Sequence, residues 1–73
     1  MQRITLPVNK FNREATYLLH TYFGDMDDTE YTLWRREGGV FVHVDTFHDF
    51  KDASKEAQEI IKNSAKLSWL ANG

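Results

Sequence analysis

The sequence contains no cysteine and only one proline, Pro7. Without cysteine, neither a disulfide nor a thiolate-bound metal ion can hold the fold together. The 73 residues are enough for one domain, which we take to be residues 1–73, and a chain this short buries only a modest core. The apolar content is nevertheless typical of a folded protein rather than a disordered one. Packing, alone or with the help of a partner, must therefore stabilise the domain.

Long apolar runs and an excess of basic charge are also missing. No apolar run approaches the length of a transmembrane helix, and the first ten residues, MQRITLPVNK, lack the apolar segment of a signal peptide. We therefore expect a cytoplasmic location and no membrane partner. The formal net charge is −2, and the basic residues are scattered, whereas nucleic-acid binders usually concentrate them on one surface. Nucleic acid is for this reason not the expected partner.

A β-hairpin at about residues 30–46 is the clearest element that the sequence does contain. The segments YTLWRR and VFVHVD flank EGG, and glycine supplies the positive φ that tight turns need. We expect a three-residue loop, 37–39, that pairs Trp34 with Val42. One face of the hairpin, the expected core face, then carries Thr32, Trp34, Val40, Val42 and Val44. The other, outer face carries Tyr31, Leu33, Arg35, Phe41, His43 and Asp45.

A shorter hairpin loop, made of the two glycines alone, is the less favoured alternative. It would place Trp34 beside His43 and mix the polar and apolar sets. Because a register shift of one residue exchanges the two faces of a strand, the choice of loop decides which side chains reach the core.

The segments on either side of the hairpin predict one further strand and one or two helices. Alternation at residues 4–8 predicts a short N-terminal strand, and Pro7 marks it as an edge. An apolar stripe at 11–23 predicts a helix, although the aromatic and threonine content of TYLLHTYF favours a strand. The C-terminal segment predicts a helix at about 53–70, capped by Asp52 or Ser54. Its buried stripe would be Ala53, Ala57, Ile60, Ile61, Ser64, Leu67 and Ala71.

Together these elements predict an α+β fold. A small antiparallel sheet, made of the hairpin and the N-terminal strand, would be packed by the C-terminal helix and by a helix at about 11–23. The order of strand, turn, strand and helix is common to many small prokaryotic modules, and it carries no function by itself.

A metal site is one functional interpretation of the hairpin's second strand. The pattern His43-x-Asp45-x-x-His48 contains three possible ligands, and His43 and Asp45 share a face about 7 Å apart by strand rise. His48 has the opposite parity, so it can join them only if the chain bends. The structural alternative is a polar pair near Arg35, with His48 in the turn before the helix. A metal-binding or catalytic module of His43, Asp45 and His48 stays an alternative function.

Catalysis has little support in the rest of the sequence. The serines near the C-terminal helix, Ser54, Ser64 and Ser68, lack the glycine pattern of a nucleophile elbow. The Gly38-Gly39 pair belongs to a hairpin turn and does not form a phosphate-binding loop. We therefore expect no enzyme activity, no resident metal and no cofactor.

The remaining class of function is binding, either to nucleic acid or to protein. A nucleic-acid-binding domain could stack bases on Tyr31 and Phe41 of the outer sheet face, but Asp45 on the same face opposes it. Protein binding is the leading hypothesis for three reasons. An acidic run could steer association, Trp69 lies on the polar side of the predicted helix, and the sheet edges are open to an added strand. The predicted partner-binding residues are Asp25, Asp27, Asp28, Glu30, Arg35, Phe41, His43, Asp45 and Trp69.

In its length, its lack of cysteine and its single α+β domain, the chain resembles small phage-encoded host-takeover proteins. In particular, it is similar to the Xanthomonas-phage inhibitor of bacterial RNA polymerase. The resemblance implies a non-enzymatic inhibitor in the host cytoplasm that binds a polymerase subunit and represses transcription. The acidic segment DMDDTE would suit a lysine-rich polymerase surface. No motif accompanies the resemblance, so it assigns no binding residue.

Overall fold

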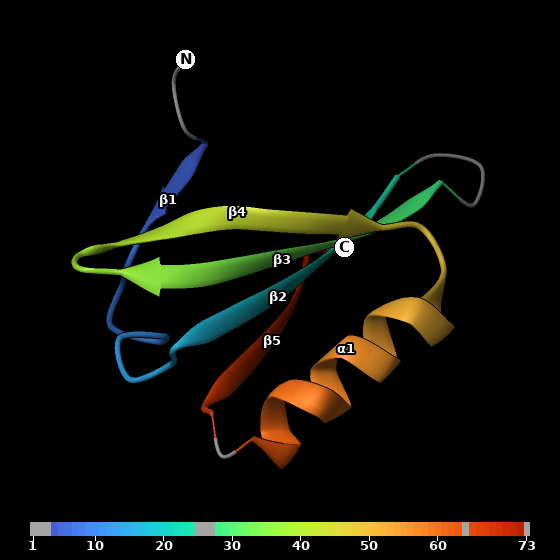
Figure 1. Cartoon of the computed structure of the whole chain (residues 1–73). Helices are drawn as coiled ribbons and strands as arrows, with labels where there is room; N and C mark the ends of the chain where they lie inside the picture. The colour runs from blue at the N-terminus through green and yellow to red at the C-terminus, as the bar shows by residue number, and fades with distance from the viewer. Residues whose placement is uncertain (1–3, 25–27, 64, 73) are drawn as a thin grey trace.

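The computed structural model describes residues 4–24, 28–63 and 65–72, which form a five-stranded sheet and one helix (Figure 1). The elements are β1 (Thr5–Pro7), β2 (Tyr17–Phe23), β3 (Thr29–Glu37), β4 (Val40–Phe47), α1 (Phe50–Lys62) and β5 (Leu67–Asn72). Their order in the sheet is β1-β4-β3-β2-β5. The predicted α+β class and the N-terminal edge strand are confirmed. The sheet is mixed rather than purely antiparallel, because β5 pairs in parallel with β2.

The predicted helix at 11–23 is wrong. Residues 10–14 form a turn, and Tyr17–Phe23 is the strand β2. Leu18 and Leu19 are both fully buried, although neighbouring residues of a strand point to opposite faces. The sheet is therefore covered on both sides of β2, so the strand shows no alternation of apolar and polar residues. Adjacent buried leucines then imitate the apolar stripe of a helix.

The hairpin register is that of the shorter loop, so the predicted three-residue loop is wrong. Glu37 pairs with Val40 and Trp34 with His43, which leaves Gly38 and Gly39 as the loop. Gly38 has φ +65°, and two-residue hairpin loops require a positive φ at this first position. Trp34 and His43 therefore share a face, as the rejected alternative required.

A β-bulge at Val44 changes the facing of β4 halfway along the strand. Trp34 pairs with His43 and Leu33 with Asp45, so Val44 has no partner on β3. Before the bulge, Phe41 lies on the face of Trp34, and after it Phe47 lies opposite Tyr31 on the other face. One strand thus contributes an aromatic residue to each side of the sheet. The predicted core face fails here, since Val40 and Val44 are exposed.

The C-terminal region is a shorter helix followed by a strand, not one helix at 53–70. Helix α1 begins at Phe50 because the Asp49 side chain accepts a hydrogen bond from the Lys51 backbone N–H, at 2.9 Å, so the predicted caps Asp52 and Ser54 are wrong. Ala53, Ala57 and Ile60 form the buried stripe as predicted, but Ile61 is exposed. Leu67 and Ala71 belong to β5, and Ser64 lies outside the described residues. Since β4 and β5 run in the same direction, α1 is the crossover between them.

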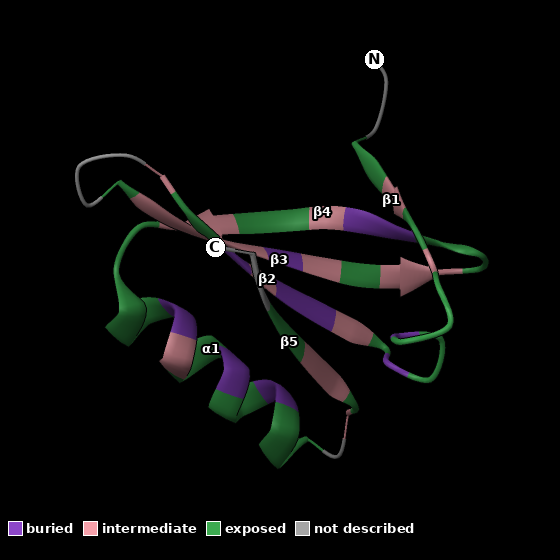
Figure 2. Ribbon diagram, turned by 180° about the vertical axis from the view of Figure 1, so that it is seen from behind, coloured by how far each residue is buried: buried purple, intermediate pink, exposed green. Residues whose placement is uncertain are grey.

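Two buried clusters form the core, one on each face of the sheet. Figure 2 shows the buried segments on α1, β2, β3 and β4. The helix-side cluster consists of Leu19, Leu33, Ala53, Ala57 and Ile60. The turn-side cluster consists of Ala15, Leu18 and Phe41, with Leu6, Val8 and Trp34 packed against it. Helix α1 covers the first (Figure 1), while β1 and the turn at 9–15 cover the second. None of the described residues forms a helix long and apolar enough to cross a membrane.

Candidate functional site

The predicted outer-face group of Arg35, Phe41, His43 and Asp45 does not exist as one surface. Arg35 and Asp45 lie on the helix side, opposite Val42 and Leu33, whereas Phe41 and His43 lie on the turn side. Phe41 is 0% exposed, so it is a core residue and offers no contact to a partner. The prediction fails because it assumed a hairpin loop that is one residue too long and did not include the bulge at Val44. The same correction removes the platform of Tyr31 and Phe41 that the nucleic-acid alternative required.

His43 and Arg35 make contacts within the domain. His43 Nε2 lies 2.8 Å from Thr46 Oγ1, and its ring meets Trp34 edge-on with centroids 5.8 Å apart. Arg35 donates a hydrogen bond to the Glu37 carboxylate at 2.8 Å, and this bond with the Glu37 charge raises the pKa of the arginine. Both interactions connect neighbouring positions of the hairpin. They are structural contacts of the sheet surface, and among the residues that the structure describes no set of converging ligands surrounds His43.

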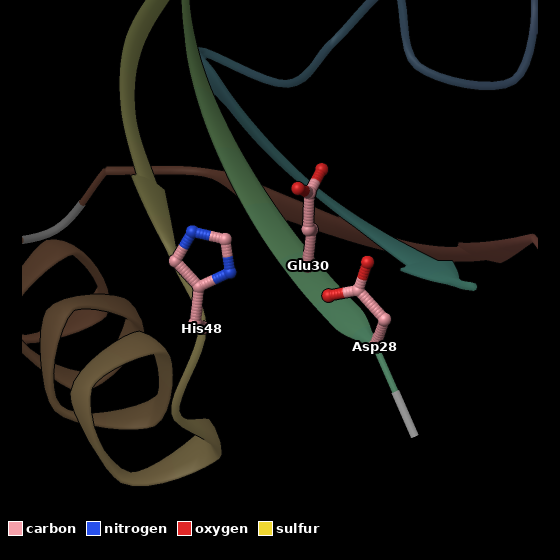
Figure 3. A group of neighbouring side chains, drawn as sticks. All are labelled: Asp28, Glu30 and His48. Carbon is pink, nitrogen blue, oxygen red and sulfur yellow. The ribbon is translucent and has the colours of Figure 1, made fainter. Parts of the chain in front are cut away.

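The proposed ligand set His43, Asp45 and His48 is therefore corrected. Asp45 faces the helix side, and its Oδ1 accepts a hydrogen bond from the Thr46 N–H at 2.8 Å. His48 instead lies beside two acidic residues, Asp28 and Glu30 (Figure 3). The ligand atoms of these three side chains all lie within 4.8 Å of one another. We call Asp28, Glu30 and His48 the acidic–histidine group.

Register brings this group together from two distant parts of the sequence. Tyr31 of β3 pairs with Phe47 of β4, so the residues one step beyond each, Glu30 and His48, become neighbours. Asp28 lies two residues before Glu30 on the same side of the chain. The Gly24 N–H donates to the Asp28 carbonyl at 2.9 Å, and a Cβ at Gly24 would collide with that oxygen. Glycine is needed here because the Asp28 carbonyl, just before β3, lies too close to position 24 for any side chain.

Of the predicted acidic run, Asp25 and Asp27 lie outside the described residues, while Asp28 and Glu30 are in the acidic–histidine group. The sequence named all three members of the group but assigned His48 to another set. The spacing Asp28-x-Glu30 at the start of a strand was a usable indication of two carboxylates on one face. Their meeting with His48 depends on the hairpin register, which the sequence interpretation had wrong.

Trp69 lies on β5 and not on a helix. Its indole Nε1–H donates to the buried Thr21 hydroxyl at 2.7 Å, and its ring stacks on Phe50 with centroids 6.0 Å apart. Phe50 in turn meets Tyr31 edge-on, also at 6.0 Å. Trp69 is 41% exposed, so part of the indole remains open to solvent while the hydrogen bond and the stacking fix its orientation.

The two edges of the sheet differ strongly. The β1 edge is three residues long and ends in Pro7, which cannot donate a backbone hydrogen bond. The β5 edge is six residues long, LSWLAN, with no charged residue and no proline. Proteins usually protect sheet edges with charges, prolines or short strands. Within the described residues β5 has none of these, and no strand of that part of the chain pairs with its outer side.

Comparison with known proteins gives no relative for this chain: no family model, no curated protein and no solved structure matches it.

Proposed function

We propose that this chain is a protein-binding module that adds an extended segment of its partner to the outer edge of β5. The observation that carries the proposal is the unprotected β5 edge, with a half-exposed tryptophan fixed beside it. In strand addition, backbone hydrogen bonds supply affinity and side-chain contacts supply specificity. β5 offers both kinds of interaction.

The backbone of β5 has hydrogen-bonding groups directed outward at alternate residues. The Tyr17 N–H donates to the Lys66 carbonyl at 3.0 Å, so Lys66 faces β2. Because the direction alternates along a strand, Ser68 and Leu70 also face β2, and Leu67, Trp69 and Ala71 face away. The N–H and C=O groups of these three residues are the ones that a partner strand would meet.

The side chains of β5 provide apolar contacts on both faces of the sheet. Trp69 lies on the helix side, paired in register with Leu19, and Leu70 lies on the turn side, paired with His20. Both are partly exposed. Tryptophan is enriched among residues that dominate binding energy, and an indole already held in one orientation loses little conformational entropy on binding. Trp69 is thus the expected anchor of the interface.

The partner class follows from this geometry: a protein with a flexible or edge-strand segment that is apolar at alternate positions. The resemblance to phage host-takeover proteins makes bacterial RNA polymerase the first partner to test. Repression of transcription would then follow from occupation of a polymerase surface. Such an interaction would consist of binding alone, with no covalent step.

Capture from a bacterial lysate on immobilised protein tests the proposal when edge variants are compared with the native chain. Ala71→Pro removes an outward-facing N–H without removing a hydrogen bond to β2, and Leu70→Lys places a charge at the edge. Both should reduce recovery of the same captured protein, whereas Ile61→Lys on the exposed side of α1 should not. Thermal unfolding of each variant verifies that it is folded.

Equal recovery on all four proteins would contradict strand addition at β5. Capture of DNA or RNA with strong salt dependence, and of no protein, would favour the nucleic-acid alternative instead.

A further inference from the structure

The acidic–histidine group has the composition of a metal site that is separate from the β5 edge. It combines two carboxylates and one imidazole, contributed by the start of β3 and by the connection from β4 to α1 (Figure 3). Within the described residues, no hydrogen bond or ion pair engages these three side chains. The two carboxylates and the unprotonated nitrogen of the neutral imidazole each offer an electron pair to a cation.

We propose that Asp28, Glu30 and His48 bind a divalent transition-metal ion, and that zinc suits their donors best. Calcium and magnesium prefer sites made of oxygen ligands alone. A nitrogen donor from histidine shifts the preference to zinc and its neighbours, which accept imidazole and carboxylate together. His48 therefore distinguishes this group from an ordinary acidic loop.

The distances fit this assignment after a small adjustment. Zinc bonds to nitrogen and oxygen are about 2.0–2.2 Å long, so ligand atoms around a tetrahedral ion lie roughly 3.3 Å apart. The three ligand atoms already lie within 4.8 Å of one another. Asp28 and His48 are exposed and Glu30 is half-buried, so rotation of these side chains can close the remaining distance without moving the sheet. Three protein ligands leave a fourth position for water or for a group of another molecule.

Binding at this site would also join two segments that the fold brings together only through register. The ion would link the residues that open β3 to His48, which directly precedes Asp49, the cap of α1. A ligand that binds only the folded chain stabilises it by mass action. Zinc should consequently raise the thermal unfolding temperature of this cysteine-free domain.

Titration of the full chain with zinc chloride, followed by calorimetry, tests the site. The native chain should bind one zinc ion per chain. His48→Gln and Glu30→Gln should each lower the zinc affinity roughly ten-fold or more, because even loss of a residue that only hydrogen-bonds to a metal ligand lowers metal affinity about 10–100-fold. His20→Gln and Asp45→Asn are matched controls, because they remove an imidazole and a carboxylate outside the group. At a free zinc concentration about a hundred times the dissociation constant, Tm should rise by roughly 10–20 °C.

Amide NMR spectra of each zinc-free variant establish that it is folded, and zinc-dependent shifts in the native chain should centre on residues 28–30 and 48. Zinc binding that survives both His48→Gln and Glu30→Gln unchanged would overturn the proposal. So would a loss of binding in His20→Gln or Asp45→Asn as large as that in the ligand variants, or an absence of saturable binding in the native chain.

Discussion

The two faces of the sheet are covered in different ways. On the helix side, one regular helix presents Ala53, Ala57 and Ile60 at helical spacing to the sheet. On the turn side, a three-residue strand and an irregular turn perform the same task over Leu18 and Phe41. The first cover follows from a periodic pattern of apolar residues, whereas the second depends on particular hydrogen bonds. Regular cover can therefore be recognised in a sequence, while irregular cover appears only once the register is known.

The central strands connect these two covers. Neighbouring residues Leu18 and Leu19 serve opposite clusters, and β4 supplies Phe41 to one side and Phe47 to the other. Substitutions at these positions can thus probe one face at a time. The following predictions use this property, from the largest expected effect to the smallest.

Phe41→Ala should be the most destabilising single change. The ring is fully buried in the turn-side cluster, and such truncations cost about 3–5 kcal/mol of unfolding free energy. Phe47→Ala, at a partly buried position on the helix side, should cost less. Urea unfolding monitored by tryptophan fluorescence compares the two. A greater loss for Phe47→Ala would mean that the turn-side cluster is not the tighter of the two.

Asn12→Ala should loosen the irregular cover. Asn12 is 3% exposed, and its Oδ1 accepts a hydrogen bond from the Asn9 N–H at 2.9 Å. Loss of this buried bond should cost about 2 kcal/mol. Hydrogen exchange should accelerate at residues 8–16 before it accelerates in α1. Uniform acceleration over both faces would show that the two covers unfold together.

Asp49→Ala is the corresponding change on the regular cover. Removal of the side-chain cap should cost about 1 kcal/mol, less than the loss at Asn12, and increase fraying at the first turn of α1. Asp52→Ala, at a residue that does not cap the helix, is the control. Equal destabilisation by the two substitutions would argue against Asp49 as the cap. Circular dichroism during urea unfolding provides the measurement.

Val44→Thr should have almost no effect. The side chain is 47% exposed at the bulge, and surface substitutions of this kind change stability by about 0.5 kcal/mol or less. The core face expected from the sequence would instead bury this residue, where an added hydroxyl costs considerably more. A loss of more than about 1 kcal/mol in unfolding free energy would instead support the register of the three-residue loop, in which Val44 is buried.

The sequence predicts the elements whose patterns are local. The α+β class, the edge strand with Pro7, the glycine turn and the first half of the α1 stripe all follow from short-range spacing. It fails where both faces of a strand are buried, as at Leu18 and Leu19, because alternation then disappears. It also fails at β5, where Leu67 and Trp69 fit a helix as readily as a strand until β2 is present to pair with them.

The candidate sites follow the same division. Asp28, Glu30 and Trp69 could be named from the sequence because acidic residues and tryptophans stand out by type. Their neighbours could not be named. The meeting of His48 with Glu30 needs the pairing of Tyr31 with Phe47, and the fixed orientation of Trp69 needs Thr21 on an adjacent strand. Both contacts join residues that are far apart along the chain.

The bulge at Val44 makes that residue an insertion that the rest of β4 does not need. Without Val44, alternation would run on regularly from His43 to Asp45, and the pairs Trp34–His43 and Leu33–Asp45 would stay as they are. Deletion of Val44 should therefore leave Phe41 and Phe47 on opposite sides of the sheet, just as substitution of its exposed side chain should change little. An unpaired residue of this kind marks a place where a strand can lose one residue without exchanging its two faces, so selection on chain length is relaxed there.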